Sequence, residues 1–378
     1  MSRNLPVVVV LGLGQIVAFA SSYYLLGVLA DPIATEFGVP PAGIFLALSV
    51  AFLLAAVLTP AGGRLIEAHG GRQVLILAHL AFGGALLLMA SAAEPWLLYV
   101  GVAALGLGMA VGLYGTAFAV LVELHGDGAR RPITAVSLMG AFGGMVGWPV
   151  SRLAVDAWDW RAACLIWAVI HLAICVPLVV RILPRRPQIA PEDRRAPAPI
   201  RWDRRMVQLA VLFAGAWMVA TAMAAHLPRL LTSLGMTPVH AAWAAGAMAG
   251  CAILARVVDL TLLHRSHPIL TARLAALCHP IGALVAAVGG SRLAPAIAVG
   301  QGVGNGFLAV ASGVLPLHVF GADRYAVRQA LLLTPARYLQ AAAPAGYALA
   351  LGISTGAAMI LTSLICLMMF AATFGLRR

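Results

Sequence analysis

The sequence predicts an all-α integral membrane protein with twelve transmembrane helices in two six-helix bundles. Its composition supports this fold class, because 62% of its 378 residues are hydrophobic, 10% are charged and the mean hydropathy is +0.96. A soluble domain of this size would carry about a quarter charged residues, so most of the chain is expected to lie in lipid. The lengths of the apolar runs and an internal repeat support it as well.

Apolar runs of about 20 residues, enough for a helix to cross a bilayer, place the spans in order. Six lie near 5–30, 41–62, 73–92, 95–121, 132–154 and 161–181, and six more near 206–231, 239–263, 269–290, 293–320, 329–352 and 354–375. The first run is too long for the apolar part of a signal peptide, so we interpret it as the first transmembrane helix. The Pro- and Arg-rich segment 182–205 is expected to be a solvated linker between bundles 1–181 and 206–378.

The basic residues indicate an orientation in the membrane. The net charge is +12, and the chain has arginine but no lysine. With the N-terminus inside, eighteen arginines fall on cytoplasmic segments and four on the opposite side. Because basic residues beside apolar spans accumulate in the cytoplasm, both termini and the linker are expected there. This charge pattern favours a multi-pass protein of a bacterial inner membrane, with lipid and not nucleic acid as its surroundings.

The cysteines carry no expected chemistry. Cys164, Cys175, Cys251, Cys278 and Cys366 all fall inside apolar runs. Their spacing fits neither a zinc site nor a disulfide framework, which favours small buried apolar residues. No cofactor and no metal site are expected.

An internal repeat relates the two halves of the chain. Residues 36–41 (EFGVPP), before the second span, resemble residues 233–238 (SLGMTP), before the eighth, at an offset of 197. Gly126 and Pro149 correspond to Gly321 and Pro344 at an offset of 195. Parallel repeats of this kind occur in transporters whose halves are related by an axis along the membrane normal.

A charged hinge lies between the second and third spans, where residues 63–72 read G-x-L-x-E-x-x-G-x-R. It resembles the corresponding loop of the major facilitator superfamily of secondary transporters. Gly63, Leu65, Gly70 and Arg72 match that pattern, and Glu67 stands where the family usually has Asp. Ala68 and Gly71 replace two usual basic residues.

This resemblance implies alternating access around a central cavity near the bilayer midplane, with spans 1, 2, 4 and 5 facing spans 7, 8, 10 and 11. It also implies that Glu67 is an acidic latch within a gating hinge formed with Gly63, Gly70 and Arg72.

Charged residues inside the spans are candidate functional residues, because a charge in lipid is costly. Arg256 and Arg337 lie in spans 8 and 11, and Asp259 lies one turn from Arg256. The middles of spans 1, 2, 4, 5, 7, 10 and 11 contain no acid, which favours an anionic substrate held by guanidinium groups. A basic residue in each of these spans resembles the oxalate and monocarboxylate branch of the superfamily, which implies that Arg256 and Arg337 contact a substrate carboxylate. Alternatively, Arg256 neutralises Asp259 and Arg337 reaches the cytoplasmic interface.

Uncharged polar side chains in the spans complete the candidate site. Hydrogen bonds to substrate are expected from Tyr23, Tyr24, Tyr114, Gln301, Asn305 and Tyr338, although such groups also join helices to one another. His226 and Asp259 are candidates for proton coupling. The glycines of 300–306 and of 140–147 indicate close helix packing, and those of 140–147 also a bend in span 5.

Two functions remain open for this chain, which shows no catalytic motif or extramembrane domain of an enzyme. The first is a carrier, expected to be monomeric, that moves a small organic anion by proton symport, exchange or uniport. The alternative is an efflux transporter of drugs or toxic amphipathic compounds, for which a large apolar cavity would be typical.

Overall fold

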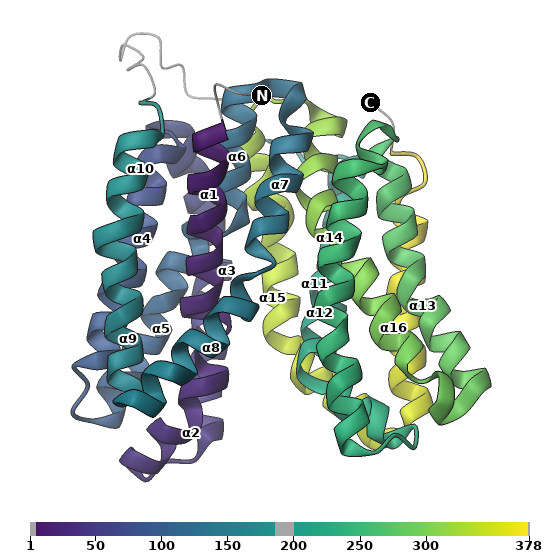
Figure 1. Ribbon diagram of the computed structural model, residues 1–378. Helices are drawn as coiled ribbons and strands as arrows, with labels where there is room; N and C mark the ends of the chain where they lie inside the picture. The colour runs from purple at the N-terminus through teal and green to yellow at the C-terminus, as the bar shows by residue number, and fades with distance from the viewer. Residues whose placement is uncertain (1–4, 186–199, 377–378) are drawn as a thin grey trace. The chain divides into compact units, whose positions relative to one another are not determined.

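The computed structural model describes residues 5–185 and 200–376. Within these two ranges the chain is helical and contains no strand (Figure 1). The helices form two compact units, one of residues Met1–Gly126, Phe142–Arg204 and Ala322–Leu331, the other of Asp127–Ala141, Arg205–Gly321 and Leu332–Arg378. Each unit therefore includes a short segment from the opposite half of the sequence. Of the expected linker 182–205, residues 186–199 lie outside the described ranges.

The first half of the sequence forms six spans, several of them interrupted. Their elements are α1 (Leu5–Ala18), η2 (Phe19–Tyr23), α2 (Leu26–Phe37), α3 (Pro41–His69), α4 (Gly71–Ala90), α5 (Pro95–Gly112), α6 (Tyr114–His125), η3 (Gly126–Ala129), α7 (Arg130–Gly140), α8 (Gly143–Ala157), α9 (Trp160–Val169), η4 (Ile170–Cys175) and α10 (Val176–Ile182). Here η2 and η4 are π-helices, and η3 is a 3₁₀ turn. Phe82, Phe118 and Trp167 are among the largest fully buried side chains of the first unit.

The second half forms six longer helices. They are α11 (Arg204–Ser233), α12 (Pro238–Thr261), α13 (Pro268–Leu293), α14 (Pro295–Phe320), α15 (Tyr325–Ile353) and α16 (Thr355–Ala372), with a short 3₁₀ turn η6 (Leu263–Arg265) after α12. Phe213 and Tyr347 are its largest fully buried side chains among the described residues. Together with the six spans of the first half, these helices confirm the predicted twelve-helix architecture.

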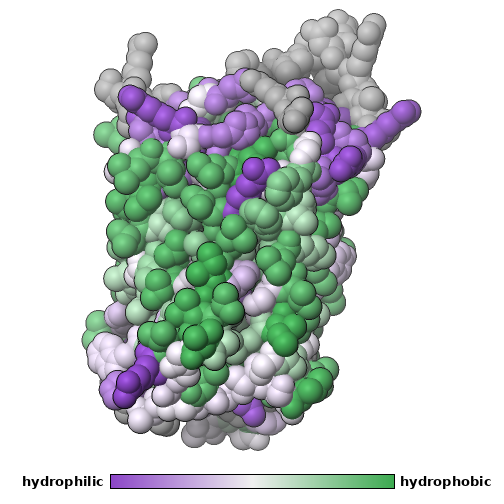
Figure 2. Space-filling model, turned by 90° about the vertical axis from the view of Figure 1, so that its right-hand side faces the viewer, coloured by the Kyte–Doolittle hydropathy of each residue, from purple (hydrophilic) through white to green (hydrophobic). Residues whose placement is uncertain are grey.

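The helices present apolar side chains to their surroundings. Val288 and Ile353, for example, are 82% and 80% exposed, which would be unfavourable in water. On the face seen in Figure 2, hydrophobic side chains cover the middle and hydrophilic ones gather at the upper end. Ten helical stretches are long and apolar enough to cross a membrane, and one of them, Pro95–Ala157, has the 63 residues of two spans. These properties describe a multi-pass membrane protein.

The glycine-rich run of α14 is packed backbone to backbone against two neighbours. A Cβ at Gly302 or Gly306 would lie 2.4 Å from a carbonyl oxygen of α12, and one at Gly300 or Gly304 would lie 2.2 or 2.8 Å from a carbonyl oxygen of α13. Since each pair is spaced by four residues, each lies along one face of the helix. The prediction that these glycines permit close helix packing is confirmed.

Four spans of the first half are interrupted. The first contains the π-helix η2, the fourth breaks at Leu113, the fifth at Ala141 and Phe142, and the sixth contains the π-helix η4. Leu113 has the extended torsions φ −84° and ψ −173°, so the helix restarts at Tyr114. These interruptions determine where the candidate functional side chains point.

Candidate functional site

Seven aromatic side chains of the first unit form a continuous group, which we term the aromatic cluster. Its members are Phe19, Tyr23, Tyr24, Phe52, Tyr114, Phe118 and Trp148. The ring centroids of successive neighbours lie 4.9–6.3 Å apart, the range of favourable ring contacts. The cluster draws its residues from spans 1, 2, 4 and 5.

Helix interruptions and small residues allow these rings to meet. The π-helix η2 carries Phe19 and Tyr23, and π-turns are frequent at functional sites. The break at Leu113 directly precedes Tyr114. Gly143 and Gly147 of α8 lie so close to η2 that an added Cβ would approach Phe19 Cβ to 2.7 Å or the Ala20 backbone to 2.8 Å. The predicted close packing of these glycines is thereby confirmed.

Trp148 closes one end of the aromatic cluster. Its indole Nε1 donates a hydrogen bond of 3.2 Å to the backbone carbonyl of Tyr24. The ring meets that of Tyr24 edge to face, with centroids 5.6 Å apart. Trp148 is also 53% exposed, so its ring has a defined orientation while about half of its surface lies outside the contacts of the protein.

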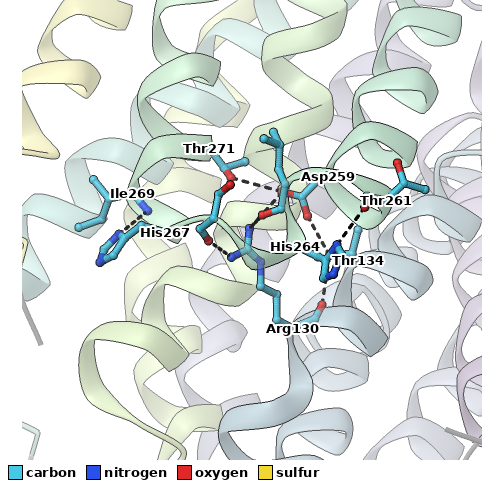
Figure 3. A network of polar contacts seen from close by, with 10 residues as sticks. Arg130, Thr134, Asp259, Thr261, His264, His267, Ile269 and Thr271 are labelled. Carbon is cyan, nitrogen blue, oxygen red and sulfur yellow. Dashed lines mark hydrogen bonds and ion pairs between the residues drawn. The ribbon is translucent and has the colours of Figure 1, made fainter.

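A polar network in the second unit surrounds Asp259, which is fully buried (Figure 3). Its Oδ1 lies 3.4 Å from Nη2 of Arg130 and accepts a hydrogen bond of 3.3 Å from Thr271. Its Oδ2 accepts one of 3.2 Å from Thr134. A buried carboxylate is tolerated when it is paired and hydrogen-bonded in this way.

Arg130 joins the start of α7 to the far end of α12. Besides Asp259, its guanidinium donates to the backbone carbonyls of Leu263, at 2.8 Å, and of Ser266. Both carbonyls lie in the turn that follows α12, and that of Leu263 also accepts a hydrogen bond of 2.9 Å from the backbone N–H of Ser266. Asp259 thus forms an ion pair with Arg130, which is 129 residues away in the sequence.

Arg256 and Arg337 are placed on different helices of the second unit. Arg256 is 5% exposed on α12, and its Nε donates to Ser137 of α7 at 3.2 Å while Nη1 donates to the carbonyl of Ala252 at 3.1 Å. Arg337 lies in the middle of α15 and is partly buried. From residue 205 onward the sequence has only two acidic side chains, Asp259 and Asp323, and that of Asp323 is 79% exposed.

The other predicted residues of the second unit lie in varied surroundings. Gln301 is buried in α14 and Asn305 is half-buried one turn further along. Tyr338, beside Arg337 in the sequence, is 43% exposed. His226 Nε2 lies 2.9 Å from the carbonyl oxygen of Pro344, and its ring contacts that of Tyr347. His226 therefore joins α11 to α15.

The charged hinge forms a compact arrangement within the first unit. Gly70, with φ 82° and ψ 153°, separates α3 from α4, and Arg72 Nη2 donates to the carbonyl of Val180 at 2.8 Å. Glu67 forms an ion pair of 2.9 Å with Arg324. A Cβ at Gly63 would lie 2.6 Å from Cβ of Ala330, so this glycine permits the close approach of α3 and the start of α15.

Comparison with known proteins identifies the family. The model of the Major Facilitator Superfamily matches residues 11–334, most of the chain. The chain belongs to the Major Facilitator Superfamily. It is accordingly a transporter of small molecules and not an enzyme. No curated protein sequence matches it.

Solved structures of superfamily transporters share the fold. The transporter FucP in its outward conformation has a TM-score of 0.79 and 16% identity, with 100% of both chains covered. A variant of the E. coli fucose:proton symporter FucP has a TM-score of 0.77 and 15% identity over the same coverage. The human organic anion transporter MFSD10 has a TM-score of 0.71 and 16% identity, covering 97% of this chain and 99% of that one. At these identities the likeness concerns the fold.

Sequence reasoning found part of this superfamily member's candidate site. It named Tyr23, Tyr24 and Tyr114, which the structure brings together in the aromatic cluster. It missed the apolar rings Phe19, Phe52 and Phe118, and also Trp148. One available signal was the spacing of four residues between Phe19 and Tyr23 and between Tyr114 and Phe118, which places each pair on one helix face.

Proposed function

We propose that this protein is a secondary transporter that moves a small organic anion, a mono- or dicarboxylate, across the membrane by alternating access. The observation that carries the proposal is the charge distribution of the second unit. Asp259 is the single acid in the spans of the second half, and its carboxylate is engaged by Arg130, Thr134 and Thr271. In sequence, the spans of the second half thus contain more arginines, Arg256 and Arg337 among them, than acids.

An anionic substrate suits this excess of positive charge. Guanidinium groups bind carboxylates through two parallel hydrogen bonds, and the low dielectric constant of the interior strengthens the attraction. We assign substrate binding to Arg337 and Arg256. Gln301, Asn305 and Tyr338 are proposed to contribute hydrogen bonds from the same unit.

The aromatic cluster is proposed to contact the apolar part of the substrate. Its rings come from spans 1, 2, 4 and 5, which the family resemblance assigns to the cavity side. The hydroxyls of Tyr23, Tyr24 and Tyr114 add hydrogen-bonding groups to an otherwise apolar surface.

Coupling and orientation complete the proposal. His226 and Asp259 are the candidate proton carriers, and the hinge around Glu67 is the candidate gate. From the arginine bias we propose that both termini lie in the cytoplasm and that the protein resides in a bacterial inner membrane.

The aromatic cluster also favours a second candidate function, the export of amphipathic compounds. Seven adjoining rings, with Trp148 about half exposed, offer an apolar surface of the kind that bulky drug-like molecules contact. Such a substrate would not depend on Arg337.

Ligand-induced thermal stabilisation of detergent-purified protein distinguishes the two functions. A ligand present at 100 times its dissociation constant stabilises the folded state by about 2.7 kcal/mol, enough to detect. We expect carboxylates to raise the unfolding temperature of the wild type and not that of the Arg337→Gln variant. Stabilisation by cationic or neutral drugs alone would contradict the anion proposal and favour the exporter.

A matched control is available in the same unit. Arg273→Gln removes the same charge from α13, where Arg273 donates to Thr373 and lies over the Phe374 ring. Stabilisation by carboxylates should survive in Arg273→Gln. Uptake into proteoliposomes should fall to background in Arg337→Gln, remain in Arg273→Gln and be partly restored in Arg337→Lys. Equal uptake by all variants would remove Arg337 from the site.

A further inference from the structure

Three potential metal ligands meet in the interior of the first unit, apart from the aromatic cluster. They are His79 on α4 and His171 and Cys175 on η4, and all three residues are at least 95% buried. One ligand atom from each lies within 4.8 Å of the other two. The Nδ1 atoms of the two imidazoles are 2.9 Å apart.

Local structure explains how the three residues come together. The π-helix η4 carries His171 and Cys175, and π-turns redirect side chains at functional sites. Gly83 on α4 lies against η4 so closely that an added Cβ would be 2.7 Å from the Leu172 side chain. This close approach brings His79, one turn before Gly83, up to the two residues of η4.

Further contacts orient His171. Its Nε2 lies 2.7 Å from Oγ of Ser21 in η2, and its ring stacks on Phe82 with the centroids 5.0 Å apart. When Nε2–H is donated to Ser21, Nδ1 carries the lone pair and points towards His79. Metal-binding histidines typically donate their second ring N–H to a neighbouring acceptor in this manner.

We propose that His79, His171 and Cys175 bind one Cu(I) ion within the first unit. Metal–nitrogen bonds of about 2.0–2.1 Å fit two nitrogen atoms 2.9 Å apart with an angle near a right angle at the metal. Thiolate is a soft ligand that selects Cu(I), and imidazole also suits copper. Binding converts the Cys175 thiol to a copper-bound thiolate and releases its proton to solvent.

Charge balance favours a monovalent over a divalent ion here. One thiolate, two neutral imidazoles and Cu(I) form a complex with no net charge, whereas Zn(II) with the same ligands leaves one positive charge. Because the site is buried inside a membrane-spanning bundle, a net charge would carry a large desolvation cost. Bound copper would crosslink α4 to η4.

Metal retention by the intact protein tests this proposal. Detergent-purified protein is loaded with Cu(I) under reducing, anaerobic conditions, exchanged against a competing chelator and analysed for metal per protein. We expect the wild type to retain one more equivalent of Cu(I) than the Cys175→Ser variant. Cys164→Ser is the matched control, because Cys164 is an equally buried cysteine of the same unit that does not belong to the ligand group, and it should retain copper like the wild type.

Copper retention by the wild-type protein is by itself a test of the proposal. If it retains no Cu(I) against the chelator, the three residues form only a hydrogen-bonded histidine pair beside a buried thiol. Equal retention by wild type and Cys175→Ser would likewise contradict the assignment. Retention of Zn(II) but not Cu(I) would contradict the choice of metal. Copper should also raise the unfolding temperature of the wild type and of Cys164→Ser, but not that of His79→Gln.

Discussion

Arg324 binds both carboxylate oxygens of Glu67, with Nε 2.9 Å from Oε1 and Nη2 3.4 Å from Oε2. The hydrogen bond to Glu67 raises the pKa of Arg324 above its ordinary value, so the guanidinium remains charged wherever the protein is folded. The backbone φ of Arg324 is 49°, in the left-handed region that non-glycine residues rarely adopt. The two-pronged ion pair thus joins the hinge to a turn with a constrained backbone.

Removal of the Glu67 charge is expected to have a measurable but moderate effect. The side chains of Glu67 and Arg324 are 26% and 21% exposed, so we expect a coupling energy of about 1 kcal/mol. A double-mutant cycle of Glu67→Gln and Arg324→Gln, followed by thermal unfolding, measures it. If the effects of the two single substitutions simply add in the double variant, the pair contributes no coupling.

Gly63→Ala should destabilise the protein. Its new Cβ would lie 2.6 Å from Ala330 Cβ and 3.0 Å from the carbonyl oxygen of Ala326, so one helix must shift. The matched control is Gly84→Ala on α4, where a Cβ would meet nothing within 4 Å. The control should leave the unfolding temperature unchanged or raise it, since alanine favours a helix over glycine by about 1 kcal/mol. Equal effects of the two substitutions would contradict the close approach at Gly63.

Arg130→Gln is expected to cause a larger loss of stability than any change at an exposed pair. It leaves the Asp259 carboxylate buried without its counter-charge, a situation that costs about 3–5 kcal/mol in other proteins. Adding Asp259→Asn to Arg130→Gln should recover part of this loss, because the buried charge is then removed. Thermal unfolding of the single and double variants measures both effects.

Asp323, whose side chain is 79% exposed and lies 3.8 Å from Arg328, provides the control for that experiment. Asp323→Asn should change the unfolding temperature little, since exposed ion pairs contribute about 0–1 kcal/mol. If the double variant Arg130→Gln with Asp259→Asn were no more stable than Arg130→Gln alone, the buried Asp259 carboxylate would not need the positive charge of Arg130.

Trp148→Ala should weaken substrate binding while leaving the folded protein intact. The substitution removes an accessible ring of the aromatic cluster and its hydrogen bond to Tyr24. We expect a smaller ligand-induced thermal shift with little change in the unfolding temperature without ligand. Trp96→Ala, at a tryptophan 64% exposed on α5 and outside the cluster, should bind like the wild type. Equal ligand shifts in the two variants would exclude Trp148 from the site.

Sequence reasoning located the spans well, because apolar runs of bilayer length are a strong signal. It also recognised the close packing at Gly302 and Gly306, since glycines four residues apart mark one helix face. The π-helices η2 and η4 were not predicted, because an extra residue in one turn leaves the composition of an apolar run unchanged. The π-helix in span 1 and the π-helix in span 6 determine the directions of the Tyr23 and Cys175 side chains.

Contacts between residues that are far apart in the sequence could not be predicted either. Asp259 suggested Arg256 as its partner, since the two share one helix, but nothing in the sequence pointed to its ion pair with Arg130 from a different helix. His79 and His171 are 92 residues apart, and their meeting depends on the rotation of α4 and η4, which an apolar sequence does not encode visibly. Helix periodicity predicts which residues share a face but not which face of another span they meet.

The glycines of α14 limit which parts of the second unit can deform during a transport cycle. At these glycines the helix backbones are in direct contact, so no side chain lies between them that could change rotamer and let the helices slide. We therefore expect α12, α13 and α14 to move as one rigid body. Arg256 and Asp259 both lie on α12, so the distance between them is expected to stay constant as this rigid body moves. Arg337 lies on α15, which is not part of this glycine-mediated packing. Of the two arginines assigned to the substrate, Arg256 thus lies on a helix that is held by close backbone packing, whereas Arg337 lies on a helix outside that packing.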